Sequence, residues 1–200
     1  MSKKRFPVRI PRYAAGIRAQ ETRGGARRSW WSAKWLSVLE GMGLKSRLGR
    51  GRSYAVSGQV AAFRMEGPHV EAEVVGTRPE PYRVTVDFRT PEGEARRSIV
   101  AALRSEPMIA ARLLADDMPM EIEEVFRANG LSLFPCGRLA DGEDGRRRYD
   151  MTTACSCPDY ANPCKHTSAA LIILGEEIAR RPAALLELRG IMLEELYDEG

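Results

Sequence analysis

Residues 155–166 read CSCPDYANPCKH, and this twelve-residue stretch holds three of the four cysteines and one of the two histidines of the chain. Cys155 and Cys157 form one pair, and Cys164 and His166 form a second pair six residues later. Three thiolates and an imidazole make a complete tetrahedral ligand set for zinc, of the kind found in structural sites. The stretch therefore predicts one structural Zn²⁺ with no open coordination position for water or substrate.

Two plainer interpretations of these cysteines stay open. Buried cysteines can act as small hydrophobic residues, and two of them could form a disulfide. A disulfide would leave an odd thiol and would give His166 no role, so zinc is favoured. The remaining Cys136 lies between Pro135 and Gly137 in a predicted loop and is interpreted as an ordinary free thiol.

Turn-forming residues separate the two ligand pairs. Pro-Asp at 158–159 and Asn-Pro at 162–163 favour reversal of the chain. Residues 149–154 suit a strand that delivers the first ligand, and the apolar spacing after Cys164 is helical. Cys164 and His166 are therefore expected in a first helical turn, where the helix dipole favours a thiolate.

The ligand spacing, Cys-x-Cys and then Cys-x-His after a gap, resembles that of the SWIM zinc finger. The resemblance implies a β-hairpin followed by an α-helix, with the first ligand pair in the hairpin and the second at the helix start. It covers every ligand position: Cys155, Cys157, Cys164 and His166.

A Trp-rich start and three further segments are similar to bacterial SWIM-family proteins. These segments carry packing residues and no ligands. They are GRGRSYAVSGQV at 49–60, PYRVTVDF at 81–88 and LLADDMPMEIEEVF at 113–126. Such proteins are commonly encoded beside a Snf-type helicase-like ATPase and are credited with binding DNA or protein. The resemblance therefore implies an ATPase of this type as a partner.

The middle of the chain predicts an antiparallel sheet. Residues 60–65, 70–75 and 82–88 are expected as strands, because apolar and polar residues alternate in them and Gly- and Pro-containing turns separate them. Helices are expected at 99–103, 107–116, 119–128, 182–188 and 191–197.

The predicted fold class is α+β: a small antiparallel sheet with helices, followed by a ββα SWIM-type zinc finger and short C-terminal helices. Three parts are expected along the chain. A basic arm covers residues 1–28, an α+β domain covers 29–140, and the zinc finger with its C-terminal helices covers 141–200. The polar loop at 141–148 is the predicted boundary before the finger.

The tryptophans belong to a predicted helix that begins after Ser29. Its apolar stripe, which is expected to pack against the core or a partner, consists of Trp31, Trp35, Val38 and Met42. Trp30 lies off this line and is expected to be more exposed. Stacking of Trp30 on nucleic-acid bases is the lesser alternative.

Positive charge is concentrated in the first quarter of the chain. Residues 1–52 hold fourteen Lys or Arg and two acidic residues, a net +12, so that residues 53–200 carry −8. LKSRLGRGRS at 44–53 is interpreted as a Gly-rich loop, and residues 1–28 as an irregular basic arm. Both predict contact with a phosphate backbone without sequence-specific readout, through Lys45, Arg47, Arg50, Arg52, Arg27 and Arg28.

The sequence contains no Walker-type phosphate loop, GxSxG or HExxH motif. Acidic residues at 121–124 suit a helix start, and His69 is expected at the surface. An apolar run of the ~20 residues that a bilayer requires is absent, as is a signal-peptide core. Thiol ligands need a reducing compartment, so a cytoplasmic location, including the nucleoid, is expected.

These features predict a non-catalytic zinc-binding accessory protein that binds nucleic acid, partners a helicase-like ATPase, or does both. The alternative is a pure protein–protein interaction subunit whose basic arm docks on an acidic protein surface. An enzyme is the third hypothesis, and it would need a ligand-deficient metal site with a general base nearby.

Overall fold

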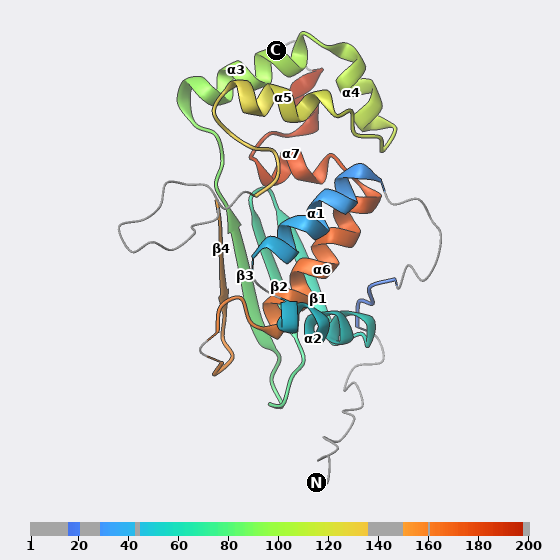
Figure 1. Ribbon diagram of the computed structural model, residues 1–200, viewed down its shortest axis with the longest axis vertical. Coiled ribbons are helices and arrows are strands. Elements are labelled where there is room, and N and C mark those ends of the chain that lie inside the picture. The colour runs from blue at the N-terminus through green and yellow to red at the C-terminus, as the bar shows by residue number, and fades with distance from the viewer. Residues whose placement is uncertain (1–15, 21–28, 43–44, 136–149, 160, 198–200) are drawn as a thin grey trace.

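A four-stranded antiparallel sheet forms the centre of the computed structural model, which describes residues 16–20, 29–42, 45–135, 150–159 and 161–197 (Figure 1). The strands are β1 (Val60–Glu66), β2 (His69–Val74), β3 (Tyr82–Phe88) and β4 (Met151–Cys155). They lie side by side in sequence order. This confirms the predicted meander, and the strand that carries Cys155 joins the same sheet as its fourth member.

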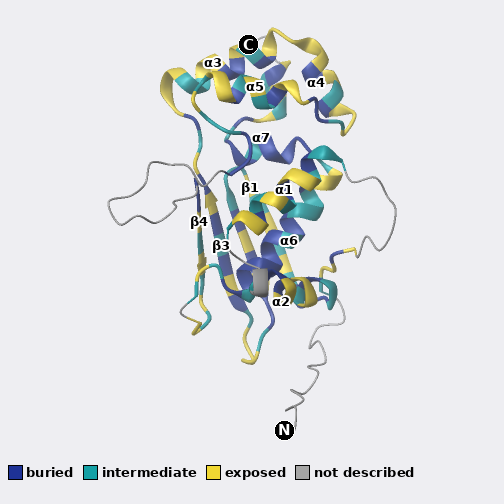
Figure 2. Cartoon of the chain, in the orientation of Figure 1, coloured by how far each residue is buried: buried dark blue, intermediate teal, exposed yellow. Residues whose placement is uncertain are grey.

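One face of the sheet is buried and the other is open to solvent, as strand alternation requires (Figure 2). Val70, Val84 and Val86 point into the core. On the open face His69 lies opposite Asp87, and its Nδ1 is 2.6 Å from Asp87 Oδ1. This hydrogen bond raises the pKa of His69. The expected surface position of His69 is thus confirmed.

Helix α6 (Lys165–Arg180) covers the buried face and contacts all four strands. Helices α1 (Trp30–Gly41) and α2 (Lys45–Val56) pack on α6. Beyond one end of the sheet lies a second group of helices, which is visible at the top of Figure 1: α3 (Gly93–Arg104), α4 (Pro107–Leu114) and α5 (Glu121–Ala128). The C-terminal elements are α7 (Ala184–Leu188) and a 3₁₀ turn, η1 (Leu193–Leu196), which contacts α3 and α4.

The predicted helix boundaries hold within two residues, except at α3. This helix begins at Gly93 rather than at residue 99, because its first turns are polar and show no apolar periodicity. Within the described residues, no helix combines the length and the apolar character that a membrane span requires.

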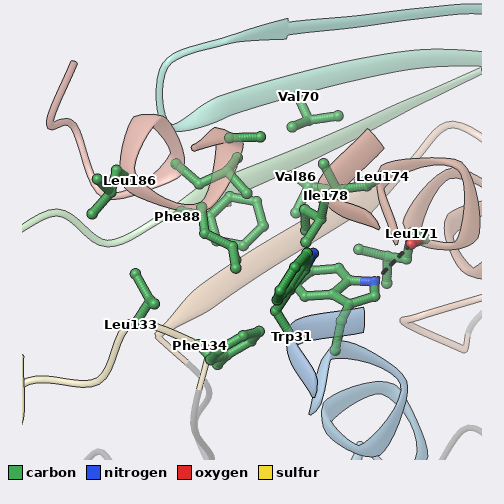
Figure 3. Packing of buried hydrophobic residues seen from close by; sticks show 14 of the residues in the cluster. Trp31, Val70, Val86, Phe88, Leu133, Phe134, Leu171, Leu174, Ile178 and Leu186 are labelled. Carbon is green, nitrogen blue, oxygen red and sulfur yellow. Dashed lines mark hydrogen bonds between the residues drawn. The ribbon is translucent and has the colours of Figure 1, made fainter. Parts of the chain in front are cut away.

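The indoles of Trp31 and Trp35 are buried, as expected. Figure 3 shows Trp31 among the other buried side chains of the core. Trp35 Nε1 donates a hydrogen bond to the Leu171 carbonyl oxygen of α6, at 3.1 Å. Gly175, one turn further along α6, makes this approach possible. A Cβ atom at Gly175 would lie 2.7 Å from Cδ1 of Trp35, so any side chain there would displace the indole.

The predicted stripe packs against the core: Val38 and Met42 lie partly buried on it, beside the buried Trp31 and Trp35. Leu39, which the prediction did not include, is the third buried residue of α1, because α6 lies on that side of the helix. Trp30 is more exposed than Trp31 and Trp35, as expected, but it is still partly buried against the core. Its Nε1 donates to the Met118 carbonyl oxygen at 2.8 Å, because the segment before α5 folds back onto α1.

The predicted Gly-rich loop at 44–53 is also wrong: from Lys45 onward it is helix α2. Its two glycines have different surroundings. Gly49 is exposed, and a Cβ atom there would meet nothing within 4 Å. Gly51 is buried against α6, where a Cβ atom would lie 2.4 Å from Ser168 Cβ and 2.9 Å from its carbonyl carbon. Gly51 is therefore explained by close packing of α2 on α6, although helix propensity alone favours a loop at a glycine.

A buried ion pair fixes the C-terminal segment to the sheet. Arg189, beyond α7, places Nη2 2.6 Å from Oδ2 of Asp150, the residue before β4. The same guanidinium donates to the carbonyl oxygens of Leu133 and Arg89, at 3.0 and 2.8 Å. A charged side chain this deeply buried needs such partners, and here three separate chain segments supply them.

The α2–α6 contact gives a matched test. Gly51→Ala should lower the free energy of unfolding by about 1–3 kcal/mol, because the methyl group overpacks the contact with Ser168. Gly49→Ala, on the exposed side of the same helix, should raise it by about 0.5–1 kcal/mol through helix propensity. Urea unfolding of the zinc-loaded proteins measures both. Equal effects of the two substitutions would contradict the packing argument.

Candidate metal centre

The first ligand pair lies where β4 leaves the sheet. Cys155 is the last residue of β4 and pairs with Val84 of β3. The next residue, Ser156, is held to β3 in two ways: its N–H donates to the Arg83 carbonyl oxygen and its Oγ accepts from the Arg83 N–H, both at 3.0 Å. The turn that carries Cys157 therefore starts from a fixed point at the sheet edge.

The second pair lies at the start of α6. Cys164 is the N-cap, and its Sγ accepts the N–H of Thr167 at 3.5 Å. His166 follows in the first turn. This confirms the expected helix start, where unpaired backbone N–H groups and the helix dipole stabilise negative charge on sulfur.

The connection between the two pairs is tied to β4 by Asn162. Its Oδ1 accepts the Thr153 hydroxyl at 2.7 Å, and its Nδ2 donates to the Thr153 carbonyl oxygen. Before it, Asp159 Oδ1 accepts the Ala161 N–H at 3.1 Å, as in an Asx turn. These bonds bring the helix start back beside the strand end.

The four predicted ligands converge on one point. Their donor atoms all lie within 4.8 Å of one another. His166 Nδ1 is 3.9 Å from Cys155 Sγ and 3.8 Å from Cys164 Sγ. A tetrahedral zinc ion bound at about 2.3 Å by sulfur and about 2.0 Å by nitrogen places its ligand atoms about 3.5–3.8 Å apart. The donor set and its spacing therefore fit one structural zinc ion.

The pKa values of the three cysteine thiols also favour binding of a cation between them. The hydrogen bond between the Cys155 and Cys164 side chains lowers the pKa of Cys164 and raises that of Cys155. Burial raises the pKa of Cys157. Three thiols this close together cannot all lose their protons without a positive charge between them. A divalent cation stabilises all three thiolates together, because metal binding displaces their protons.

Two tyrosines that the sequence did not indicate surround the imidazole ligand. Tyr82 of β3 stacks on the His166 ring with centroids 4.5 Å apart and an angle of 30° between the planes. Tyr54 of α2 meets the same ring edge-on, at 5.4 Å and 68°. In the sequence Tyr82 is an ordinary inward position of an alternating strand, and Tyr54 lies in the segment predicted as a loop, so no sequence signal linked either one to the metal.

The predicted nucleic-acid contacts do not lie at the metal itself. Arg47, Arg50 and Arg52 lie on α2. Lys45 begins this helix, but its side chain lies outside the described part of the structure, as do Arg27, Arg28 and Cys136. Among the described residues, the four zinc ligands are the group of Cys, His and acidic side chains with metal-binding spacing.

Removing one ligand should release the metal. Cys157→Ser should lose stoichiometric zinc and unfold the β4–α6 connection, because binding energy at such a site is largely folding energy. Cys136→Ser is the control and should keep one zinc ion per chain. Elemental analysis and thermal unfolding measure both outcomes. A Cys157→Ser protein with wild-type zinc content and stability would contradict the assignment.

Comparison with known proteins agrees with this geometry. The sequence pattern of the SWIM zinc finger family matches residues 146–175. "Uncharacterized protein Rv2102" of Mycobacterium tuberculosis (strain ATCC 25618 / H37Rv) is 40% identical over 190 residues. The match covers 95% of this chain and 65% of that protein, so the chain spans just under two thirds of its relative's length. No solved structure matches the chain. Ligand set, helix start and family pattern together identify residues 146–175 as a SWIM zinc finger that binds one structural zinc ion.

Proposed function

We propose that this chain is a non-catalytic, cytoplasmic accessory module that binds the phosphate backbone of nucleic acid and works beside a Snf-type helicase-like ATPase. The position of α2 supports nucleic-acid binding. This helix has four cationic and no acidic residues, and it packs directly on the zinc-binding helix α6. Zinc thus fixes the helix against which the cations are held.

The cations of α2 fall on two sides of the helix. Arg47, Arg50 and Tyr54 are spaced i, i+3 and i+7, so they lie along one side. Lys165 of α6 continues this side, because its Nζ is 5.5 Å from the centre of the Tyr54 ring. We name Arg47, Arg50 and Lys165 the basic stripe. It joins α2 to the first turn of the finger helix.

Arg52 lies about 200° around the helix from Arg50, on the other side of α2. There it lines a groove with Trp35, Ile172 and Glu176. Arg52 is therefore not part of the basic stripe. Its contact with nucleic acid stays a prediction.

The chemistry of the stripe favours phosphate over bases. Arginine forks bind phosphate oxygens in pairs. The three tryptophans are packed inside the fold or hydrogen-bonded to its backbone, so none of them is free to stack on bases. Backbone contact without sequence-specific readout is therefore the expected mode.

A different region supports the protein partner. At the end of the molecule formed by α3, α4 and α5, the large apolar side chains Met108, Leu114 and Met120 are 68%, 60% and 63% exposed. Leu114 also lines a groove with Leu196 and Tyr197 of the C-terminal segment. Exposed apolar side chains gathered at one end of a chain are typical of a protein-binding surface. We propose that the ATPase binds there.

The double variant Arg47→Ala/Arg50→Ala should weaken binding to duplex DNA and make it less sensitive to salt. Two lost phosphate contacts should reduce the slope of log K against log [salt] by roughly 2. The control is Arg97→Ala/Arg127→Ala, which removes the same charge from exposed positions on α3 and α5. Fluorescence anisotropy over a range of salt concentrations measures both, with zinc content verified. Equal losses in the two variants, or none, would contradict the basic stripe.

Substitutions on the two proposed surfaces should have opposite effects on capture of the ATPase and on DNA affinity. From nuclease-treated native extract, the zinc-loaded chain should retain the ATPase, identified by mass spectrometry. Leu114→Ser should reduce that capture and leave DNA affinity unchanged, whereas Arg47→Ala/Arg50→Ala should do the reverse. An ATPase that is lost on nuclease treatment would show that DNA alone bridges the two proteins.

A further inference from the structure

The imidazole ligand of the zinc site is held in an unusual way. A zinc-binding histidine normally donates its second ring N–H to a carboxylate, a carbonyl or water, and that bond orients the ring. Here Nδ1 faces the thiols, and Nε2 is buried without a hydrogen-bond partner among the described residues. His166 is 3% exposed, so bulk solvent does not supply that partner. Among the described residues, packing contacts surround this ring in place of a hydrogen-bond acceptor.

Two aromatic rings pack against the imidazole. Tyr82 lies flat on the imidazole at 4.5 Å, and Tyr54 closes a second side at 5.4 Å. Offset stacking and edge-on contacts of this kind fix ring orientation and contribute about 0.5–1.5 kcal/mol each beyond burial. Tyr82 is itself fixed, since it is 3% exposed and its hydroxyl lies 3.2 Å from Thr77 Oγ1.

A glycine leaves the room that this arrangement needs. A Cβ atom at Gly76 would lie 2.3 and 2.8 Å from two ring carbons of Tyr82, and 3.1 Å from His166 Nε2. Any other residue at position 76 would therefore displace the tyrosine ring from its place beside the imidazole. The backbone of Gly76 thus forms the remaining wall beside Nε2.

Cations cover the tyrosines in turn. The Arg78 guanidinium lies 5.8 Å from the centre of the Tyr82 ring, and Lys165 Nζ lies 5.5 Å from that of Tyr54. Cation–π contacts of this length are attractive. The contacts therefore run from Arg78 through Tyr82, His166 and Tyr54 to Lys165, and they combine residues from three separate segments of the chain.

We infer that Tyr82, supported by Tyr54 and Gly76, is a positioning residue for the zinc ligand His166. The stacked ring restricts the orientation of the imidazole and holds Nδ1 toward the sulfurs. Tyr54, Gly76 and Tyr82 all lie outside residues 146–175, so the finger depends on β3 and α2 for full metal affinity. This inference concerns the zinc site and does not depend on nucleic-acid binding.

The test compares Tyr82→Leu with Tyr82→Phe in the full chain. Tyr82→Leu removes the ring and should lower zinc affinity by about 10–100-fold, the usual effect of losing an outer partner of a ligand. It should also shift the ligand-field absorption of the Co²⁺-substituted protein, because the imidazole is no longer held in place. Tyr82→Phe keeps the ring and loses only the contact with Thr77, so its affinity and Co²⁺ spectrum should stay close to those of the parent chain.

Controls separate positioning from general stability. Val70→Ala, on β2 away from the imidazole, should destabilise the core and leave both zinc affinity and the Co²⁺ spectrum unchanged. If Val70→Ala lowers affinity as much as Tyr82→Leu, or if Tyr82→Leu binds zinc with parental affinity and spectrum, the inference is wrong. If Tyr82→Leu does not fold, Gly76→Ala replaces it. That variant should show the same loss of affinity and shift in spectrum, and parental values for both would equally overturn the proposal.

Discussion

A single zinc ion joins the end of β4 to the start of α6, and the rest of the fold is arranged around the helix that it anchors. Cys155 and Cys157 belong to the strand side of the site, while Cys164 and His166 belong to the helix side. Helix α6 then covers the sheet and carries α1 and α2 on its outer surface. Because metal binding at such sites is coupled to folding, the ion determines whether α6 begins at the right place.

Close packing against α6 and the buried Arg189–Asp150 ion pair also hold the fold together. Gly51 and Gly175 allow α2 and Trp35 to approach α6 more closely than any other residue would permit. At the opposite end of β4, Arg189 binds Asp150 and two carbonyl oxygens. Buried ion pairs of this kind add little net stability, and this one joins the C-terminal segment to the residue before β4. Strand β4 is therefore fixed at one end by zinc and at the other by Arg189.

The finger is physically continuous with the segments that precede it. Its strand pairs with β3, its helix packs on α2, and its imidazole ligand contacts Tyr54 and Tyr82. The strand expected before β4 in a ββα finger, and the predicted boundary at residue 141, lie outside the described residues. This continuity supports the view that zinc, the basic stripe and the sheet act as one unit, with the exposed apolar end of α4 and α5 as a separate surface.

The sequence by itself determined the ligand set, the strands and most of the helices. Scarce side chains at metal spacing, alternation of period two and proline at helix starts are local signals that need no knowledge of the fold. Tertiary structure decided the helical state of α2, the partial burial of Trp30 and the contact of Tyr82 with His166, because each depends on a partner distant in sequence. In the sequence Gly51 has the features of a loop residue, and only the fold shows that Ser168 packs against it. Tyr82 has the features of an ordinary core residue, and only the fold shows that its ring stacks on His166. Long-range contacts of this kind leave no periodicity in the sequence and arise only when the sheet and α6 come together.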